Sequence, residues 1–156
     1  MTQSVLDKTR FLNVDLDVRS KSDLQPLADA MGKKVIVLHV GRFKRTYEAH
    51  LELSGSPLPQ VRHPKSPEML ILGFCRLVQE LPPGARELWD SAKTRTFDIG
   101  IEAPGPSNCY WSAISPKALR AASEINAHIA VTVYGPMKRA KVPGKSRRVK
   151  STNSAP

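Results

Sequence analysis

Alternating apolar and polar residues mark several short segments of the chain as strands. Between residues 11 and 19, four aliphatic side chains alternate with polar ones without a break, and residues 47–53 and 97–102 repeat the pattern. A period of two is typical of a strand with one buried face and one open face. Residues 35–40 instead form a nearly continuous apolar run rich in β-branched residues, which predicts a central strand buried on both faces.

Two further strands are expected in the last third of the chain. Residues 109–114, which begin with Cys109, and residues 129–133 are short and rich in apolar residues. Their length and composition favour strands. We expect Val131 of the last strand to lie in the core, as Val14 of the first strand does.

Helix starts recur between the strands. Ser66 and Ser115 each precede a proline, a pairing that is typical of an N-terminal cap followed by the first helical residue. Shorter helices are expected over residues 23–31 and 85–92, the second with Trp89 facing inward.

The predicted order of elements is β-α-β-β-α-β-β-α-β. Its first six elements have the order of a ferredoxin-like unit, in which two helices cover one face of an antiparallel sheet. We therefore predict an α+β domain, namely a ferredoxin-like β-α-β-β-α-β sheet with helices on one face, extended by an extra β-α-β. The domain is expected to span residues 10–136, between a disordered N-terminus (1–9) and a disordered basic tail (137–156).

Short motifs in the second half of the chain follow one another as strand, capped helix and strand. They are Phe97-Asp98-Ile99-Gly100, then Ile114-Ser115-Pro116 with Leu119, and a closing strand that ends at Tyr134. Over residues 97–134 this order resembles a bacterial family, the domain of unknown function numbered 4279. That family has no assigned activity, so the resemblance implies a fold and adds no site.

The net charge of +10 is concentrated at one end of the chain. All 14 acidic residues lie before residue 138, so the first 137 residues carry +3 and the last 19 carry +7. This distribution predicts a folded domain of small net charge, followed by a cationic extension. Such an extension can bind the phosphates of nucleic acids regardless of their sequence. Its seven cations are Lys138, Arg139, Lys141, Lys145, Arg147, Arg148 and Lys150.

The N-terminal ten residues are polar and lack the apolar segment of a signal peptide. No apolar run in the sequence approaches the roughly 18 residues that a membrane-spanning helix needs. We therefore expect a cytoplasmic protein with no membrane span, in which Cys75 and Cys109 are reduced thiols.

Sequence motifs of cofactor binding and catalysis are missing. The chain has no glycine-rich phosphate loop, no CxxC pair, no GxSxG elbow and no HExxH motif. Cys75 lies in the middle of a predicted helix, where a buried structural thiol is the expected role. The sequence therefore predicts no cofactor and no catalytic residue, and it favours a protein that is not an enzyme.

The polar positions of the alternating strands gather on the sheet face away from the helices. In the ferredoxin-like order the first and third strands are neighbours, which sets Asp15 and Asp17 against Glu48 and His50. These four side chains can bind a divalent cation or act as acid and base. Their mixed spacing favours a solvated polar face instead. The predicted face comprises Asp15, Asp17, Glu48, His50, Glu52, Asp98 and Glu102.

Three classes of function follow, in order of preference. The first is a non-catalytic binding protein that engages another protein, a class that includes immunity proteins that neutralise toxins. The second is a nucleic-acid-associated protein that uses the basic tail, together with the turn at Arg42, Lys44 and Arg45. The third is a small enzyme or metal binder that uses the acidic face. The partner and the oligomeric state are left open by the sequence.

Overall fold

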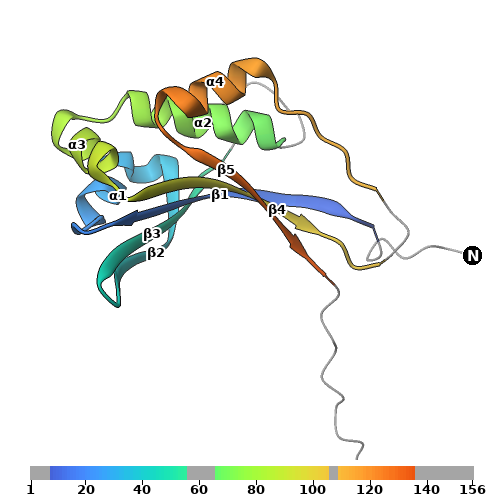
Figure 1. Cartoon of the computed structure of the whole chain (residues 1–156), viewed down its shortest axis with the longest axis horizontal. Helices are drawn as coiled ribbons and strands as arrows, with labels where there is room; N and C mark the ends of the chain where they lie inside the picture. The colour runs from blue at the N-terminus through green and yellow to red at the C-terminus, as the bar shows by residue number, and fades with distance from the viewer. Residues whose placement is uncertain (1–7, 56–65, 106–108, 136–156) are drawn as a thin grey trace, which may run out of the picture.

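The protein has a mixed α+β fold in a computed structural model that describes residues 8–55, 66–105 and 109–135. Five strands form one sheet, and four α-helices lie on one side of it (Figure 1). No helix in these ranges is long and apolar enough to cross a membrane. In chain order the elements are β1 (Arg10–Ser20), α1 (Gln25–Met31), the 3-10 helix η2 (Gly32–Lys34), β2 (Val35–Phe43), β3 (Thr46–Leu53), α2 (Pro67–Gln79), α3 (Pro83–Ser91), β4 (Thr94–Glu102), α4 (Pro116–Glu124) and β5 (His128–Tyr134).

The sheet has the strand order β2-β3-β1-β4-β5, with β1 in the centre. β1 pairs antiparallel with β3 and with β4, and β2 pairs antiparallel with β3. The predicted α+β class and the neighbouring positions of the first and third strands are therefore confirmed. β5 pairs parallel with β4, so the sheet is mixed and differs from the purely antiparallel ferredoxin-like arrangement.

The prediction that residues 35–40 form a central strand is wrong, because β2 lies at an edge of the sheet. β3 occupies the position between β2 and β1, and no other strand of the described part of the chain lies beside β2. Val35 is buried at the start of β2, but the next three apolar side chains are between 48% and 53% exposed. The apolar run therefore belongs to an edge strand whose side chains are half exposed.

The strand predicted over residues 109–114 is also wrong, since these residues pair with no strand. β4 and β5 are parallel, so the chain must return along the length of β4 before β5 begins. The nine residues of β4 span about 30 Å, whereas the nine residues of α4 span only about 14 Å. An extended segment leading into α4 spans the remaining distance (Figure 1).

β5 forms the second edge of the sheet, and its outer half is uncovered. Ile129, near its start, packs against the core. Val131 is 58% exposed and Val133 is similarly exposed. The expectation that Val131 lies in the core is therefore wrong, because the short helix α4 covers only the beginning of this strand.

The core forms between the helices and the sheet face that carries the aliphatic positions of β1. Val14, Leu16 and Val18 are at most 1% exposed. Phe74 of α2 stacks on Phe97 of β4, with the ring centroids 5.5 Å apart. Removing this apolar surface from water is the main stabilising contribution to such a fold.

The N-termini of α2 and α4 are joined to each other by hydrogen bonds. The Ser66 hydroxyl accepts a hydrogen bond from the backbone N–H of Met69, and the Ser115 hydroxyl accepts one from Ala118, as the sequence predicts for N-terminal caps. The carboxylate of Glu68, in the first turn of α2, accepts hydrogen bonds from the Ser115 hydroxyl (2.7 Å) and the Ser115 backbone N–H (3.2 Å). This carboxylate therefore fixes the start of α4 beside the start of α2.

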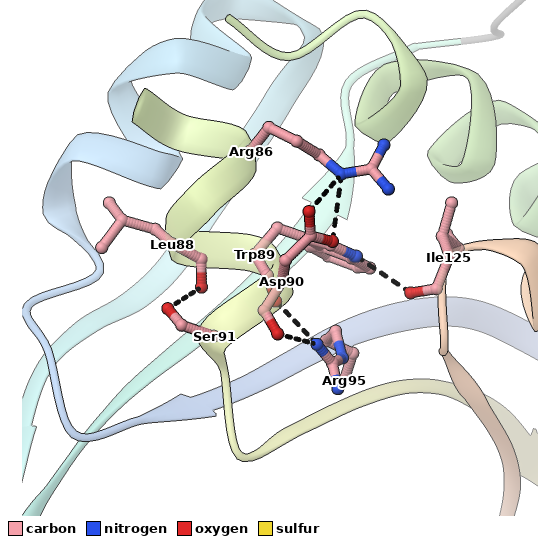
Figure 2. Close-up of polar contacts among 7 residues, drawn as sticks. All are labelled: Arg86, Leu88, Trp89, Asp90, Ser91, Arg95 and Ile125. Atoms are coloured by element: carbon pink, nitrogen blue, oxygen red, sulfur yellow. Dashed lines mark hydrogen bonds and ion pairs between the residues drawn. The ribbon is translucent and has the colours of Figure 1, made fainter. Parts of the chain in front are cut away.

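Trp89 connects α3 to the corner between α4 and β5 (Figure 2). Its ring is fully buried, as predicted, and its indole Nε1–H donates a hydrogen bond of 3.0 Å to the carbonyl of Ile125. Arg95 of β4 donates from Nη1 to the carbonyls of Trp89 (2.7 Å) and Asp90 (3.1 Å). The Arg95 bonds add to the backbone bond that the Trp89 carbonyl accepts from Ala92 and tie the end of α3 to β4.

Candidate functional site

The alternation of side chains places the predicted acidic positions on the sheet face opposite the helices. Cross-strand register puts Asp15 of β1 between Glu52 of β3 and Asp98 of β4. In the next row, Asp17 faces His50 of β3. The sheet therefore brings together the residues that the sequence pattern assigned to one face.

Most acidic groups on this face interact with a partner. Asp17 Oδ1 lies 2.5 Å from His50 Nδ1, and both Asp98 oxygens accept from the Thr132 hydroxyl, at 2.9 and 2.7 Å. Glu102 Oε2 pairs with Arg10 Nε at 2.6 Å. These contacts satisfy the polar groups within the sheet itself.

Glu48 is the most buried carboxylate of the face. Its Oε1 lies 2.7 Å from Arg19 Nε, although the alignment is that of an ion pair rather than a hydrogen bond. Its Oε2 lies 3.7 Å from Nε2 of His50. Because only 7% of Glu48 is exposed, its pairing with Arg19 offsets part of the cost of removing the charge from water.

Asp15 differs from its neighbours because one carboxylate oxygen is buried and unpaired. Among the residues that the structure describes, Oδ1 of Asp15 has no hydrogen-bond partner. Burial, followed by repulsion from Glu52, Asp17 and Asp98 and a hydrogen bond with Glu52, raises the pKa of Asp15 from 3.8 to about 6. The carboxyl group is therefore protonated in part of the population near neutral pH.

The raised pKa predicts that the stability of the protein falls as pH rises from about 4 to about 7. Within this range the folded protein holds a proton on Asp15 that the unfolded chain has already released, so ionisation favours the unfolded chain. We expect Asp15→Asn to remove this fall and to stabilise the protein above pH 7 by about 1–2 kcal/mol. Urea denaturation at pH 4.5 and 7.5 measures both effects.

Asp29→Asn serves as the matched control, because Asp29 is exposed on α1. This variant should retain the pH dependence of the unmodified protein. A marked destabilisation of Asp15→Asn at pH 7.5 would instead indicate that the Asp15 carboxylate is required as a charged partner.

The proposed metal ligands Asp15, Asp17, Glu48 and His50 lie on one face but do not converge on a single point. Asp17 contacts Nδ1 of His50, while Glu48 is directed to Arg19. Within the described ranges, no group of three or more histidine, cysteine or acidic side chains is arranged to hold a metal ion. The geometry therefore favours a solvated face with internal pairs.

The two thiols differ in environment. Cys75 of α2 is buried, as predicted, and burial raises its pKa to about 11. A thiol with such a pKa is protonated and unreactive at neutral pH. Cys109 is exposed and lies in the extended segment before α4 rather than at the start of a strand.

The candidate nucleic-acid contacts of the basic tail cannot be placed relative to the fold. Residues 136–156, and with them the seven cations from Lys138 to Lys150, lie outside the described residues, as do residues 1–7, 56–65 and 106–108. The proposed limits of the domain at residues 10 and 136 accordingly stay predictions. The basic turn at Arg42, Lys44 and Arg45 is described, and all three side chains are exposed.

The edge of β2 is a candidate binding surface that the sequence analysis missed. Ile36, Val37, Leu38 and Phe43 are all about half exposed along this edge. We call these four residues the β2 patch. A continuous apolar run predicts a buried strand, whereas these side chains are half exposed. The five basic residues and no acids over residues 32–45 could have indicated an edge instead, because edge strands commonly carry flanking lysine and arginine.

The chain was compared with protein-family models, with curated proteins and with solved structures, and none of the three comparisons found a match.

Proposed function

We propose that the protein is a non-catalytic binding protein that engages another protein through the β2 patch. The observation that supports this function is the run of three consecutive half-exposed apolar residues, Ile36–Val37–Leu38, on a strand with a free edge. The side chains lie on both faces of β2, since Ile36 is opposite Glu52 and Val37 is opposite Leu51, so a partner strand added to this edge would contact residues of both faces. A bulge between Val37 and His39 displaces the strand at Leu38, the most exposed of the three.

The charges around the β2 patch specify the chemistry of the partner. Lys33 and Lys34 precede the strand, and Arg42, Lys44 and Arg45 surround its end at the hairpin turn. An apolar centre with a charged rim is the usual anatomy of a protein interface. The complementary partner is an apolar protein segment flanked by acidic residues.

The same charges argue against a second copy of this chain as the occupant. In an antiparallel β2–β2 pair, Lys33, which precedes the strand in one copy, would approach Arg42 near the end of the strand in the other. Like charges directly opposite each other destabilise a strand pair. The β2 patch therefore favours a different protein, and an immunity-type function is one member of this class.

The basic tail, the ferredoxin-like assignment, the cellular location and the family resemblance are further proposals. Binding of nucleic-acid phosphates by the tail is a second candidate, supported by its seven cations. The ferredoxin-like assignment is supported by the antiparallel order β2-β3-β1-β4. A cytoplasmic location and the resemblance to the family numbered 4279 stay proposals.

The partner chemistry can be tested with a labelled peptide that has valines at its centre and glutamates at both ends. We expect the full-length protein to bind this peptide more tightly than the same peptide with lysines at both ends, because the rim of the patch is basic. Leu38→Lys should weaken binding of the acidic peptide at least tenfold, since it places a charge in the apolar centre. Fluorescence anisotropy measures each affinity.

Val131→Lys provides the control, because Val131 is equally exposed on the opposite edge strand. Its affinity for the acidic peptide should equal that of the unmodified protein. Equal losses in the two variants would contradict the assignment to β2. A single-stranded oligonucleotide that competes fully with the peptide would favour the nucleic-acid function.

A further inference from the structure

A cavity of about 550 Å³ lies on the helical side of the molecule, next to the start of β2. Its wall combines side chains of η2, the end of β3, α2 and α4. This volume is within the range of small-molecule sites. The cavity is therefore large enough for a small organic ligand.

The cavity is apolar on one side. Leu53, Met69, Leu72 and Leu77 line it, and Gly73 in the middle of α2 leaves the helix without a side chain at that point. Leu53 and Leu77 belong to the buried core, so the apolar wall rests on the rigid part of the fold. An apolar ligand body can remove this surface from water.

The remaining wall is cationic. Lys33, Lys34, Arg76 and Lys117 line the cavity, and Glu80 is the one acidic residue that does so. Lys34 Nζ lies 2.9 Å from Glu80 Oε2, and this pair neutralises both groups. Across the described residues, Lys33, Arg76 and Lys117 form no ion pair with a carboxylate.

From this arrangement we propose that the cavity binds a small organic anion with an apolar body, namely an aliphatic carboxylate. The hydrocarbon chain lies against the leucines and Met69, and the carboxylate accepts charge-assisted hydrogen bonds from Arg76 and Lys117. Lys33 adds a third positive charge at the wall. A bound carboxylate supplies these cations with an ion-pair partner, because Glu80, which also attracts Arg76, is already paired with Lys34.

The cations of the cavity wall come from separate elements of the fold. Lys33 belongs to η2, Arg76 to α2 and Lys117 to α4, so the fold brings together charges that are far apart in the sequence. Like charges that face one cavity repel one another. A bound anion relieves this repulsion, which gives the ligand a physical reason to bind in addition to apolar contact.

Isothermal calorimetry with decanoate, below its micelle concentration, tests the proposal on the full-length protein. We expect saturable binding of decanoate, weaker binding of uncharged 1-decanol and no detectable binding of acetate. The double variant Arg76→Gln/Lys117→Gln should bind decanoate at least tenfold more weakly and 1-decanol unchanged. Both replaced side chains are exposed, so we expect the variant to fold normally.

Arg120→Gln is the matched control, because Arg120 is an exposed cation on α4 that does not line this cavity. Its affinity for decanoate should equal that of the unmodified protein. Failure of decanoate to bind would overturn the proposal. Equal weakening by Arg120→Gln would also overturn it, because it would indicate a general attraction to positive surface.

Discussion

Val14→Asp is expected to unfold the protein. Val14 lies on the central strand β1 and is fully buried among the residues of the core. An aspartate there would place an unpaired carboxylate in apolar surroundings, at a cost of several kcal/mol. Since small domains are stable by only about 5–15 kcal/mol, this cost is comparable to the whole stability. Circular dichroism should show loss of a cooperative thermal transition.

The matched variant Val131→Asp makes the same chemical change on the edge strand β5. Because Val131 is 58% exposed, its new carboxylate remains in water, and we expect a loss of about 1 kcal/mol or less. An equally large loss in both variants would contradict the exposed position of Val131. It would indicate that another molecule or another part of the chain covers β5.

Trp89→Ala is expected to destabilise the protein by about 3–5 kcal/mol. The substitution empties a fully buried site between α3 and the core, and it removes the hydrogen bond from Nε1 to the carbonyl of Ile125. Trp89→Phe keeps most of the ring volume but leaves that carbonyl without its donor, and we expect a smaller cost of about 1–3 kcal/mol. Urea denaturation of the two variants separates packing from hydrogen bonding.

Trp111→Ala is the internal control for this experiment, because Trp111 is the other tryptophan of the chain and is 81% exposed. We expect its stability to lie within about 0.5 kcal/mol of the unmodified protein. In that variant Trp89 is the sole tryptophan, so its fluorescence reports unfolding of the core directly. Equal losses for the two tryptophans would contradict their different burial.

The opposite faces of the molecule differ in charge. Acidic side chains occupy the open face of the sheet, whereas Lys33, Arg76 and Lys117 surround the cavity on the helical side. The small net charge of the first 137 residues therefore averages an acidic sheet face and a cationic cavity wall. The acids of the open face also disfavour binding of RNA there, since its phosphates would be repelled.

Much of the fold could be predicted from the sequence alone, because it depends on residues that are close together in the chain. The strict alternation around Val14 and Asp15 assigned their opposite faces, because successive side chains of a strand point to opposite sides. Ser66 and Ser115 identified two helix starts, because a cap needs only a hydroxyl three residues before a free backbone N–H. These features depend on neighbours within one turn or one strand, so a single sequence carries them.

Strand order and exposure were decided by the tertiary structure. The same apolar run suits a central or an edge strand, and only the placement of β3 between β2 and β1 left Ile36, Val37 and Leu38 uncovered. Residues 109–114 have strand-forming composition, but the parallel pairing of β4 with β5 occupies the edge at which they could have paired. Pairing with a distant segment is not encoded in local periodicity.

The cavity and the Trp89 contact depended entirely on long-range packing. Trp89 Nε1 and the Ile125 carbonyl are separated by 36 residues, and the cations of the cavity come from three different elements. The sequence determined that these residues could donate hydrogen bonds or carry charge. The packing of α2, α3 and α4 on the sheet determined which of them meet, because side-chain contacts between elements are fixed only when their apolar faces are buried together.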